Sequence, residues 1–271
     1  MAYLPTLRWK RRVFLKQAKL VPAIESGNVF AAHHRAEPSP KLKRVLCIGN
    51  IGTLGEALIA RLISAPGYKD VVTATKFPMQ STTSRLTFCA FDALHQAAAW
   101  PDVDDVVILA DGKPSYFKRD DVFPVVAESQ VAALAKIAVA AGVKRLLVIA
   151  PTEAWQAYSA NGFTHLGELE RELRALPIAD LIVVRPSEQS GHQPEKSRRG
   201  FLQRVADGMM GALGQYMIPQ RFQPLRGHVV AEAAVDWLVT LPSGQHFLNA
   251  EHLYEWRAKK YPQQYTPTVK L

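Results

Sequence analysis

Three glycines, at positions 49, 52 and 55, form the part of this sequence with the clearest chemical meaning. They lie within residues 43–63, KRVLCIGNIGTLGEALIARLI, between a short apolar run and an amphipathic run. Gly49 permits a tight turn, Gly52 lets backbone amides approach a pyrophosphate, and Gly55 lets a helix pack close to a strand. Amides at the start of a helix attract anions. The pattern predicts a nucleotide phosphate site in a turn between a strand and a helix.

The other residues capable of chemistry show no comparable pattern. Cys47 and Cys89 both fall within expected strands, which indicates buried thiols and not a disulfide or a metal pair. The eight histidines are scattered, and even His33 and His34 lack partners at metal-ligand spacing. We therefore expect no metal site. No apolar run reaches the roughly eighteen residues that a transmembrane helix needs, so we expect no transmembrane segment.

The elements that would position the glycine turn alternate regularly from Arg44 onward. Short β-rich apolar runs predict strands buried on both faces at 45–48, 71–74, 86–91, 106–110, 146–150 and 181–184. Helices are expected at 56–64, 125–141, 166–176, 201–213, 231–241 and 251–259, with a last strand at 245–249. Strands that alternate with helices predict an α/β fold, a Rossmann-type doubly wound parallel sheet with a basic N-terminal extension.

The positive charge is concentrated before this fold. Residues 1–44 hold ten Lys and Arg against only Glu25 and Glu37, a net charge of +8, so +1 of the total +9 remains for residues 45–271. We expect residues 1–43 to be a basic arm and linker, and residues 44–271 to be an NAD(P)-binding domain with a substrate-side region from about residue 186. A polyanion-binding domain would carry its charge on the folded body, so nucleic-acid recognition by the domain is not expected.

The arm itself is Arg/Lys-rich, poor in acidic residues and interleaved with leucines. This composition is typical of an organellar transit peptide. The alternatives are a solvated basic tail and an arm that docks on RNA, acidic protein or anionic lipid.

Five motifs in order resemble the atypical short-chain dehydrogenase/reductase superfamily, especially its NmrA-like and transcription-cofactor-like NAD(P)-binding branch. They are GNIGTLG after the first strand, Asp92 after the third, AAGVKRLLVIA at the fifth, GELERELRAL in the next helix and VVRPSEQSG after the sixth. The resemblance covers residues 43–255.

Active members of that superfamily use a Ser after the fifth strand and a Tyr and Lys four residues apart, since Tyr and Lys must share one helical face. As the resemblance implies, these three positions correspond to Ala150, Gly162 and Leu166 in this chain. We therefore expect a dehydrogenase scaffold without its proton-transfer residues. The alternative is an active NAD(P)H oxidoreductase with another proton donor, for which Tyr158 and His165 are the candidates.

Cofactor binding is expected to persist. An acidic residue after the second strand would favour NAD; this chain has Thr75 and Lys76, which slightly favours NADP over NAD. The resemblance places Asp92 near the adenine. The full set of expected cofactor residues is Gly49, Asn50, Ile51, Gly52, Thr53, Leu54, Gly55, Thr75, Lys76, Asp92, Ala110, Gly112 and Pro186.

These observations favour a catalytically silent, NAD(P)-binding accessory subunit of a mitochondrial assembly, on the matrix side. The favoured host is an inner-membrane respiratory complex. In role it resembles the Rossmann-fold accessory subunits of such complexes, with other protein subunits as partners. A mitochondrial ribosome-associated protein and a redox-sensing regulator are the remaining alternatives, because both use the same glycine turn and neither needs a catalytic residue.

Overall fold

We describe a computed structural model of the chain, in which residues 42–49, 52–81, 83–110, 118–152, 167–187 and 225–262 are described. The expected arm before residue 42 and the expected helix at 201–213 lie outside these residues. The description below concerns the unit from Leu42 onward.

Seven strands form one parallel sheet in the described part of the chain. They are β1 (Lys43–Ile48), β2 (Tyr68–Thr75), β3 (Leu86–Ala90), β4 (Asp105–Leu109), β5 (Arg145–Ile149), β6 (Asp180–Arg185) and β7 (Gln245–Asn249). Their order is β3-β2-β1-β4-β5-β6-β7, and every neighbouring pair is parallel. The strand order reverses between β1 and β4, which is the point where open α/β sheets bind ligands at the carboxyl ends of their strands.

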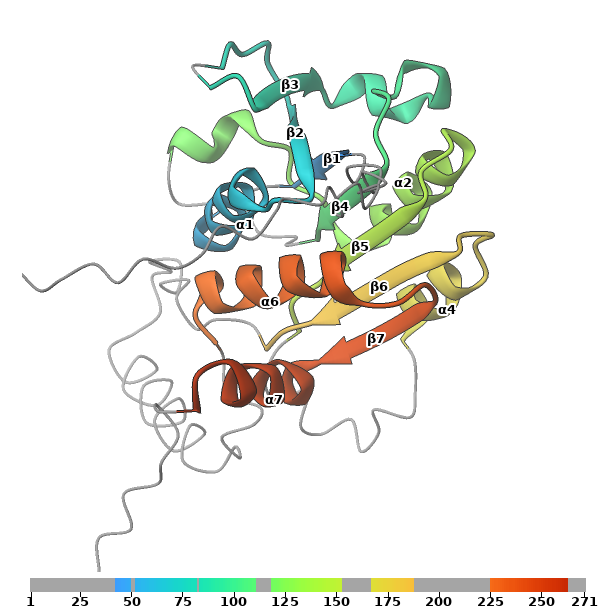
Figure 1. Ribbon diagram of the computed structural model, residues 1–271. Helices are drawn as coiled ribbons and strands as arrows, with labels where there is room; N and C mark the ends of the chain where they lie inside the picture. Colours follow the sequence, from blue (N-terminus) through green and yellow to red (C-terminus); the bar gives the residue numbers. More distant parts are fainter. Residues whose placement is uncertain are drawn as a thin grey trace, which may run out of the picture. The chain divides into compact units, whose positions relative to one another are not determined.

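Helices cover both faces of the sheet (Figure 1). On one face lie α1 (Gly52–Ser64), α6 (Gly227–Thr240) and α7 (Ala250–Lys260). On the other lie α2 (Glu128–Ala140) and α4 (Glu168–Arg174), with the 3-10 helix η1 (Asp92–His95). The expected Rossmann-type doubly wound architecture is confirmed by this arrangement.

Alternate residues of the central strands enter the two cores. In β1, Val45 and Cys47 pack with α1 and α6, whereas Leu46 and Ile48 pack with α2 and α4. All four side chains are fully buried. Because successive side chains of a strand point to opposite faces, a strand covered on both sides must be apolar throughout, which explains the short apolar runs in the sequence.

The strands match the sequence expectations closely, but several helices begin elsewhere. α1 begins at Gly52 and not at residue 56, and α6 begins at Gly227 and not at residue 231. Glycine is a weak helix former, so a helix that starts on one is easily missed. α2 begins at Glu128 and not at residue 125, because Ala127 is extended and its N–H donates to the Gln130 side chain, 2.9 Å away.

A buried carboxylate ties the amino ends of β1, β2 and β4 together, at the edge opposite the glycine turn. Asp105 is fully buried, accepts a 2.6 Å hydrogen bond from the Tyr68 hydroxyl and pairs with Lys43 at 3.2 Å. Burial and the neighbouring Asp105 raise the pKa of Tyr68, so the phenol remains a donor. These contacts fix the register of the strand that leads into the glycine turn.

Candidate dinucleotide site

The glycine turn follows β1 and contacts the carboxyl end of β4. Gly49 is buried with φ +82°, and a Cβ there would lie 2.2 Å from the Leu109 carbonyl oxygen. Gly52 has φ +67°, but a Cβ there would meet nothing within 4 Å. Only glycine therefore fits at 49, whereas at 52 the positive φ alone favours glycine, because no atom stands near the place of a Cβ. Asn50 and Ile51, between them, lie outside the described residues.

The helix that follows begins against another helix. Gly55 is buried in α1, Thr53 is exposed and Leu54 is partly exposed. A Cβ on Gly227 would lie 3.1 Å from the backbone nitrogen and Cα of Leu54, so the first turns of α1 and α6 pack backbone to backbone. This close packing holds the amide-bearing start of α1 in position.

The first amide of α1 already binds an anionic oxygen. The Gly52 N–H donates to Oδ2 of Asp120 at 3.0 Å. Asp120 comes from the 3-10 helix η3 (Lys118–Val122), which follows β4 and lies beside α1 in Figure 1. The residue is 7% exposed. A carboxylate at a helix N-terminus is stabilised by the free amides and the helix dipole, and the same physics would hold a phosphate.

The same segment reaches the end of β2. The Lys76 N–H donates to the Val122 carbonyl at 2.7 Å, while the residue itself is exposed. Thr75 is buried and its hydroxyl lies 3.4 Å from the Cys89 carbonyl in β3. Of the two residues expected to select the cofactor, Lys76 alone therefore presents an exposed side chain. Asp92, expected near the adenine, is exposed at the start of η1 beyond β3.

The remaining expected residues that the structure describes follow the next strands at the same edge. Ala110 is buried after β4 and its N–H donates to the Ile149 carbonyl at 2.8 Å. Pro186 is buried after β6 and its carbonyl accepts from the Thr152 N–H at 2.9 Å. Gly112 lies outside the described residues. The strand ends thus bring Gly49, Ala110 and Pro186 to one edge of the sheet, as the topology requires.

Of the three positions that correspond to the superfamily's Ser, Tyr and Lys, Ala150 is described by the structure. Ala150 is fully buried after β5, and its methyl group offers neither a proton nor a hydrogen bond. Gly162 and Leu166, together with the alternative donors Tyr158 and His165, lie outside the described residues. Two hydroxyl residues do meet at this edge, since Thr152 and Ser187 form a parallel bridge beyond the ends of β5 and β6.

An ion-pair network fixes the carboxyl end of β6 beside this edge. Arg185 donates from Nε to Glu170 of α4 at 2.5 Å and from its two terminal nitrogens to Glu128 of α2 at 3.0 and 2.8 Å. Burial of Glu170 opposes its charge, but the hydrogen bonds and positive charge of Arg185 outweigh that effect and hold the pKa of Glu170 below its usual range. One guanidinium therefore joins two helices to a strand end.

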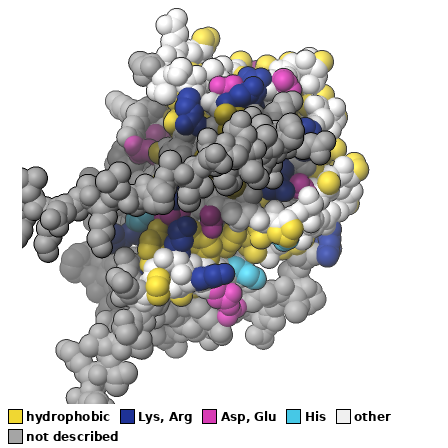
Figure 2. Space-filling view, in the orientation of Figure 1, with side chains coloured by type: hydrophobic (Ala, Val, Ile, Leu, Met, Phe, Trp, Pro, Cys, Tyr) yellow, Lys and Arg dark blue, Asp and Glu magenta, His cyan; other side chains and the backbone are white. Residues whose placement is uncertain are grey.

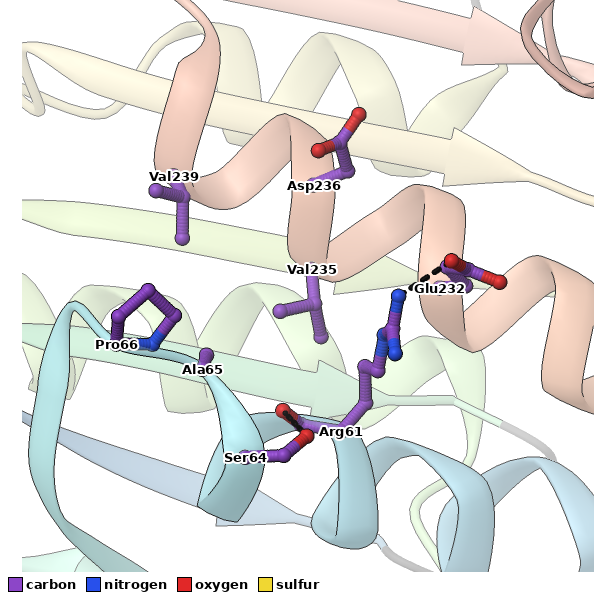
Figure 3. Close-up of a pocket in the computed structure, with 8 residues that line it drawn as sticks. All are labelled: Arg61, Ser64, Ala65, Pro66, Glu232, Val235, Asp236 and Val239. Atoms are coloured by element: carbon purple, nitrogen blue, oxygen red, sulfur yellow. Dashed lines mark hydrogen bonds and ion pairs between the residues drawn. The ribbon is translucent and has the colours of Figure 1, made fainter. Parts of the chain in front are cut away.

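A hollow between α1 and α6 is separate from the glycine turn (Figure 3). Its volume is about 300 Å³, and Arg61 of α1 pairs with Glu232 of α6 beside it. Val235 and Val239 of α6 face Ala65 and Pro66, which follow α1. Because α1 runs antiparallel to the strands, its last turn lies at the opposite edge of the sheet from Gly52. This hollow is therefore no part of the dinucleotide site.

Asp120 was not among the site residues expected from the sequence. It follows β4 within the run KRDDVF, and 68 positions separate it from the amide that it contacts. Charged residues in a loop are usually solvated, so only the fold shows that this carboxylate is directed at the phosphate turn.

On the face of the described residues that Figure 2 shows, Lys and Arg side chains are interspersed with Asp and Glu. Within the described ranges no group of three or more His, Cys, Asp and Glu is placed to hold a metal. None of the described helices combines the length and apolar character needed to cross a bilayer.

The strand order, two-sided helix cover and glycine turn define a Rossmann-type dinucleotide-binding fold. No family model and no curated protein matches the sequence. Among solved structures, the chain is similar to MoeE5 in complex with UDP-glucose and NAD, at 18% identity over 81% of this chain and 82% of that chain, with a TM-score of 0.46. It is also similar to UDP-N-acetylglucosamine 4-epimerase from Bacillus cereus, at 13% identity over 76% and 78% of the two chains, with a TM-score of 0.45.

A third similar structure is a short-chain dehydrogenase/reductase from Veillonella parvula in complex with NADP, at 15% identity over 53% of this chain and 68% of that chain, with a TM-score of 0.35. At these identities the likeness concerns the fold. The fold expected from the resemblance is the one observed.

Proposed function

We propose that this protein binds a nicotinamide dinucleotide at the Gly49–Gly52 turn and works as a catalytically silent accessory subunit of a larger assembly. The observation that carries the proposal is the Gly52 amide, which donates to an anionic oxygen at 3.0 Å at the reversal of strand order. An amide placed in this way for a carboxylate is placed equally well for a phosphate.

The nicotinamide class of ligand is supported by the neighbouring structures, which were solved with NAD or with NADP. The exposed Lys76 after β2 favours the 2′-phosphate of NADP, because a cation at this position would pair with that group. Ala150 supports the absence of proton transfer, since it stands where the superfamily has its Ser.

The charge of the N-terminal arm bears on the cellular location and the partners of the protein. The net charge of +8 on residues 1–44 supports an arm that directs the protein to the mitochondrion, on the matrix side, and tethers it to an inner-membrane respiratory complex. Its partners there are protein subunits, and the arm contacts acidic protein, anionic lipid or RNA. A mitochondrial ribosome is the alternative host.

Calorimetric titration with NADPH and NADH tests the binding. We expect saturable binding of both, with NADPH tighter, and we expect Lys76→Gln to weaken NADPH binding while NADH binding is unchanged. Lys69→Gln, at the exposed second residue of β2 and far from the strand's carboxyl end, is the matched control for the loss of one lysine charge. If the wild-type protein binds neither dinucleotide, the proposed function is wrong.

Catalytic silence is tested separately with carbonyl substrates and either reduced cofactor. Robust turnover that Tyr158→Phe or His165→Ala abolishes would establish the alternative, an oxidoreductase with a non-standard proton donor.

A further inference from the structure

We propose that η3 is an internal competitor for the dinucleotide, and that Asp120 occupies the position of a cofactor phosphate until the ligand displaces it. The inference rests on the proposed function and adds a regulatory device to the same site. In the described structure, the device consists of one carboxylate, one amide and the short segment that carries the carboxylate.

The Asp120 carboxylate and a cofactor pyrophosphate need the same hydrogen-bond donor. The Gly52 N–H donates to Oδ2 of Asp120 at 3.0 Å, and a backbone N–H carries one proton to donate. A pyrophosphate in the glycine turn would require this donor. Its charge would also be repelled by a carboxylate at hydrogen-bond distance from the same nitrogen. Both anions cannot occupy the turn together.

η3 runs from the start of α1 to the end of β2. η3 is tied to the start of α1 through Asp120 and to the end of β2 through the 2.7 Å bond from the Lys76 N–H to the Val122 carbonyl. The start of α1 and the end of β2 flank the space where the fold places the phosphates and the adenosine ribose of a dinucleotide. The segment therefore bridges the ligand site and does not merely border it.

η3 makes few buried apolar contacts, so we expect it to be displaced at a low free-energy cost. A hollow of about 340 Å³ lies between η3 and α1, lined by Ile59, Ala60, Ile63 and Phe123 as well as Gly52 and Asp120. Val122 and Phe123 are only partly buried, and Asp121 is exposed. Segments with few buried apolar contacts open at low free-energy cost. Displacement of η3 would break the Asp120–Gly52 and Lys76–Val122 hydrogen bonds, while the buried residues of both cores lie outside η3.

Competition of this kind lowers the apparent affinity by the fraction of molecules whose turn is open. Asp120→Asn keeps the shape of the side chain and an acceptor oxygen but removes the repelling charge. Asp121→Asn makes the same change of charge at the exposed neighbour in η3 and serves as the matched control. Thermal unfolding of both variants verifies that they are folded.

The decisive experiment is calorimetry of the full-length protein and the two variants with NADPH and NADH. We expect Asp120→Asn to bind at least about fivefold more tightly than the wild type, and Asp121→Asn to bind within twofold of it. Equal or weaker binding by a folded Asp120→Asn variant would overturn the competition while leaving the proposed function intact. If neither the wild type nor Asp120→Asn binds, the proposed function fails and the competition fails with it.

A second measurement tests the contact without any ligand. Amide hydrogen exchange at Gly52 should be slow in the wild type and faster in Asp120→Ala, since the acceptor is removed. Fast exchange at Gly52 in the wild-type protein would overturn the proposal, whatever the affinities prove to be.

Discussion

Gly49 is the residue on which the geometry of the turn depends. Its positive φ and the Leu109 carbonyl oxygen, 2.2 Å from where a Cβ would stand, leave no room for any side chain. Gly52 has a similar φ but open space before it. Gly49 is therefore required by its φ and by the packing of β1 against β4, whereas Gly52 is favoured by its φ alone.

This difference predicts unequal effects of one substitution. Gly49→Ala should lower the free energy of unfolding by at least about 2 kcal/mol, because left-handed backbone strain adds to overpacking against β4. Gly52→Ala should cost only about 1 kcal/mol, from the backbone strain alone. Chemical denaturation measures the free energy of unfolding of both variants. Equal losses would show that the contact with β4 adds nothing to the cost of a side chain at position 49.

Tyr68 is the residue that satisfies the buried Asp105 at the opposite edge. Tyr68→Phe removes the 2.6 Å hydrogen bond and leaves the carboxylate with Lys43 alone among the contacts described above. We expect a loss of about 1–3 kcal/mol in the free energy of unfolding. Tyr261→Phe, which removes a 2.6 Å hydrogen bond to Glu232 instead of one to a fully buried carboxylate, is the control for the loss of a phenol. A loss no larger than that of the control would contradict the role assigned to Tyr68.

Among the elements, α4 is held to the sheet by charge as well as by its apolar face. Oε1 of Glu170, in the first turn of α4, lies 2.5 Å from Nε of Arg185 at the end of β6. The pKa of Glu170 is depressed in the folded protein. A carboxyl whose folded pKa is depressed contributes stability that is present above its unfolded pKa, about 4.3, and is lost as pH falls through the folded pKa.

We therefore expect the stability difference between the wild type and Glu170→Gln to be largest near pH 7 and to shrink at pH values below about 4. Glu168→Gln, at the exposed start of the same helix, is the control. Urea unfolding at a series of pH values gives the comparison. A difference that does not vary with pH would mean that the substitution acts through packing and not through the ion pair.

The elements also show what sequence reasoning reaches and where it stops. Strands such as β1 and β4 were predictable because burial on both faces makes them continuously apolar. The starts of α1 and α6 were missed because each helix begins on a glycine, which propensity disfavours. The contact of η3 with the glycine turn could not be predicted, since Asp120 meets Gly52 only after β4 has been placed beside β1.

At the scale of the whole molecule, the chain separates a near-neutral domain from a strongly basic arm. The charge of residues 45–271 is +1, and this part holds the glycine turn and the whole sheet except Lys43 and Arg44, the first two residues of β1. We therefore expect folding and dinucleotide binding to depend on the domain, and assembly to depend on the arm.

A chain that begins near Pro40 should consequently fold and melt cooperatively but fail to join its native complex. Charge reversal at Arg8, Lys10, Arg11 and Arg12 should have the same selective effect, because each removes attraction to an acidic protein, RNA or lipid surface. Thermal stability is compared with co-migration in native gels of cell extracts. Normal co-migration of the shortened chain would contradict the tethering role of the arm.

The central claim, that a nicotinamide dinucleotide binds at the glycine turn in place of Asp120, is tested most directly by the amide signal of Gly52 in a nuclear magnetic resonance titration with NADPH. We predict a saturable shift of the Gly52 and Lys76 amide signals, because one exchanges a carboxylate for a phosphate acceptor and the other loses its bond to Val122. Binding that leaves both signals unchanged, or no binding at all, would contradict the account.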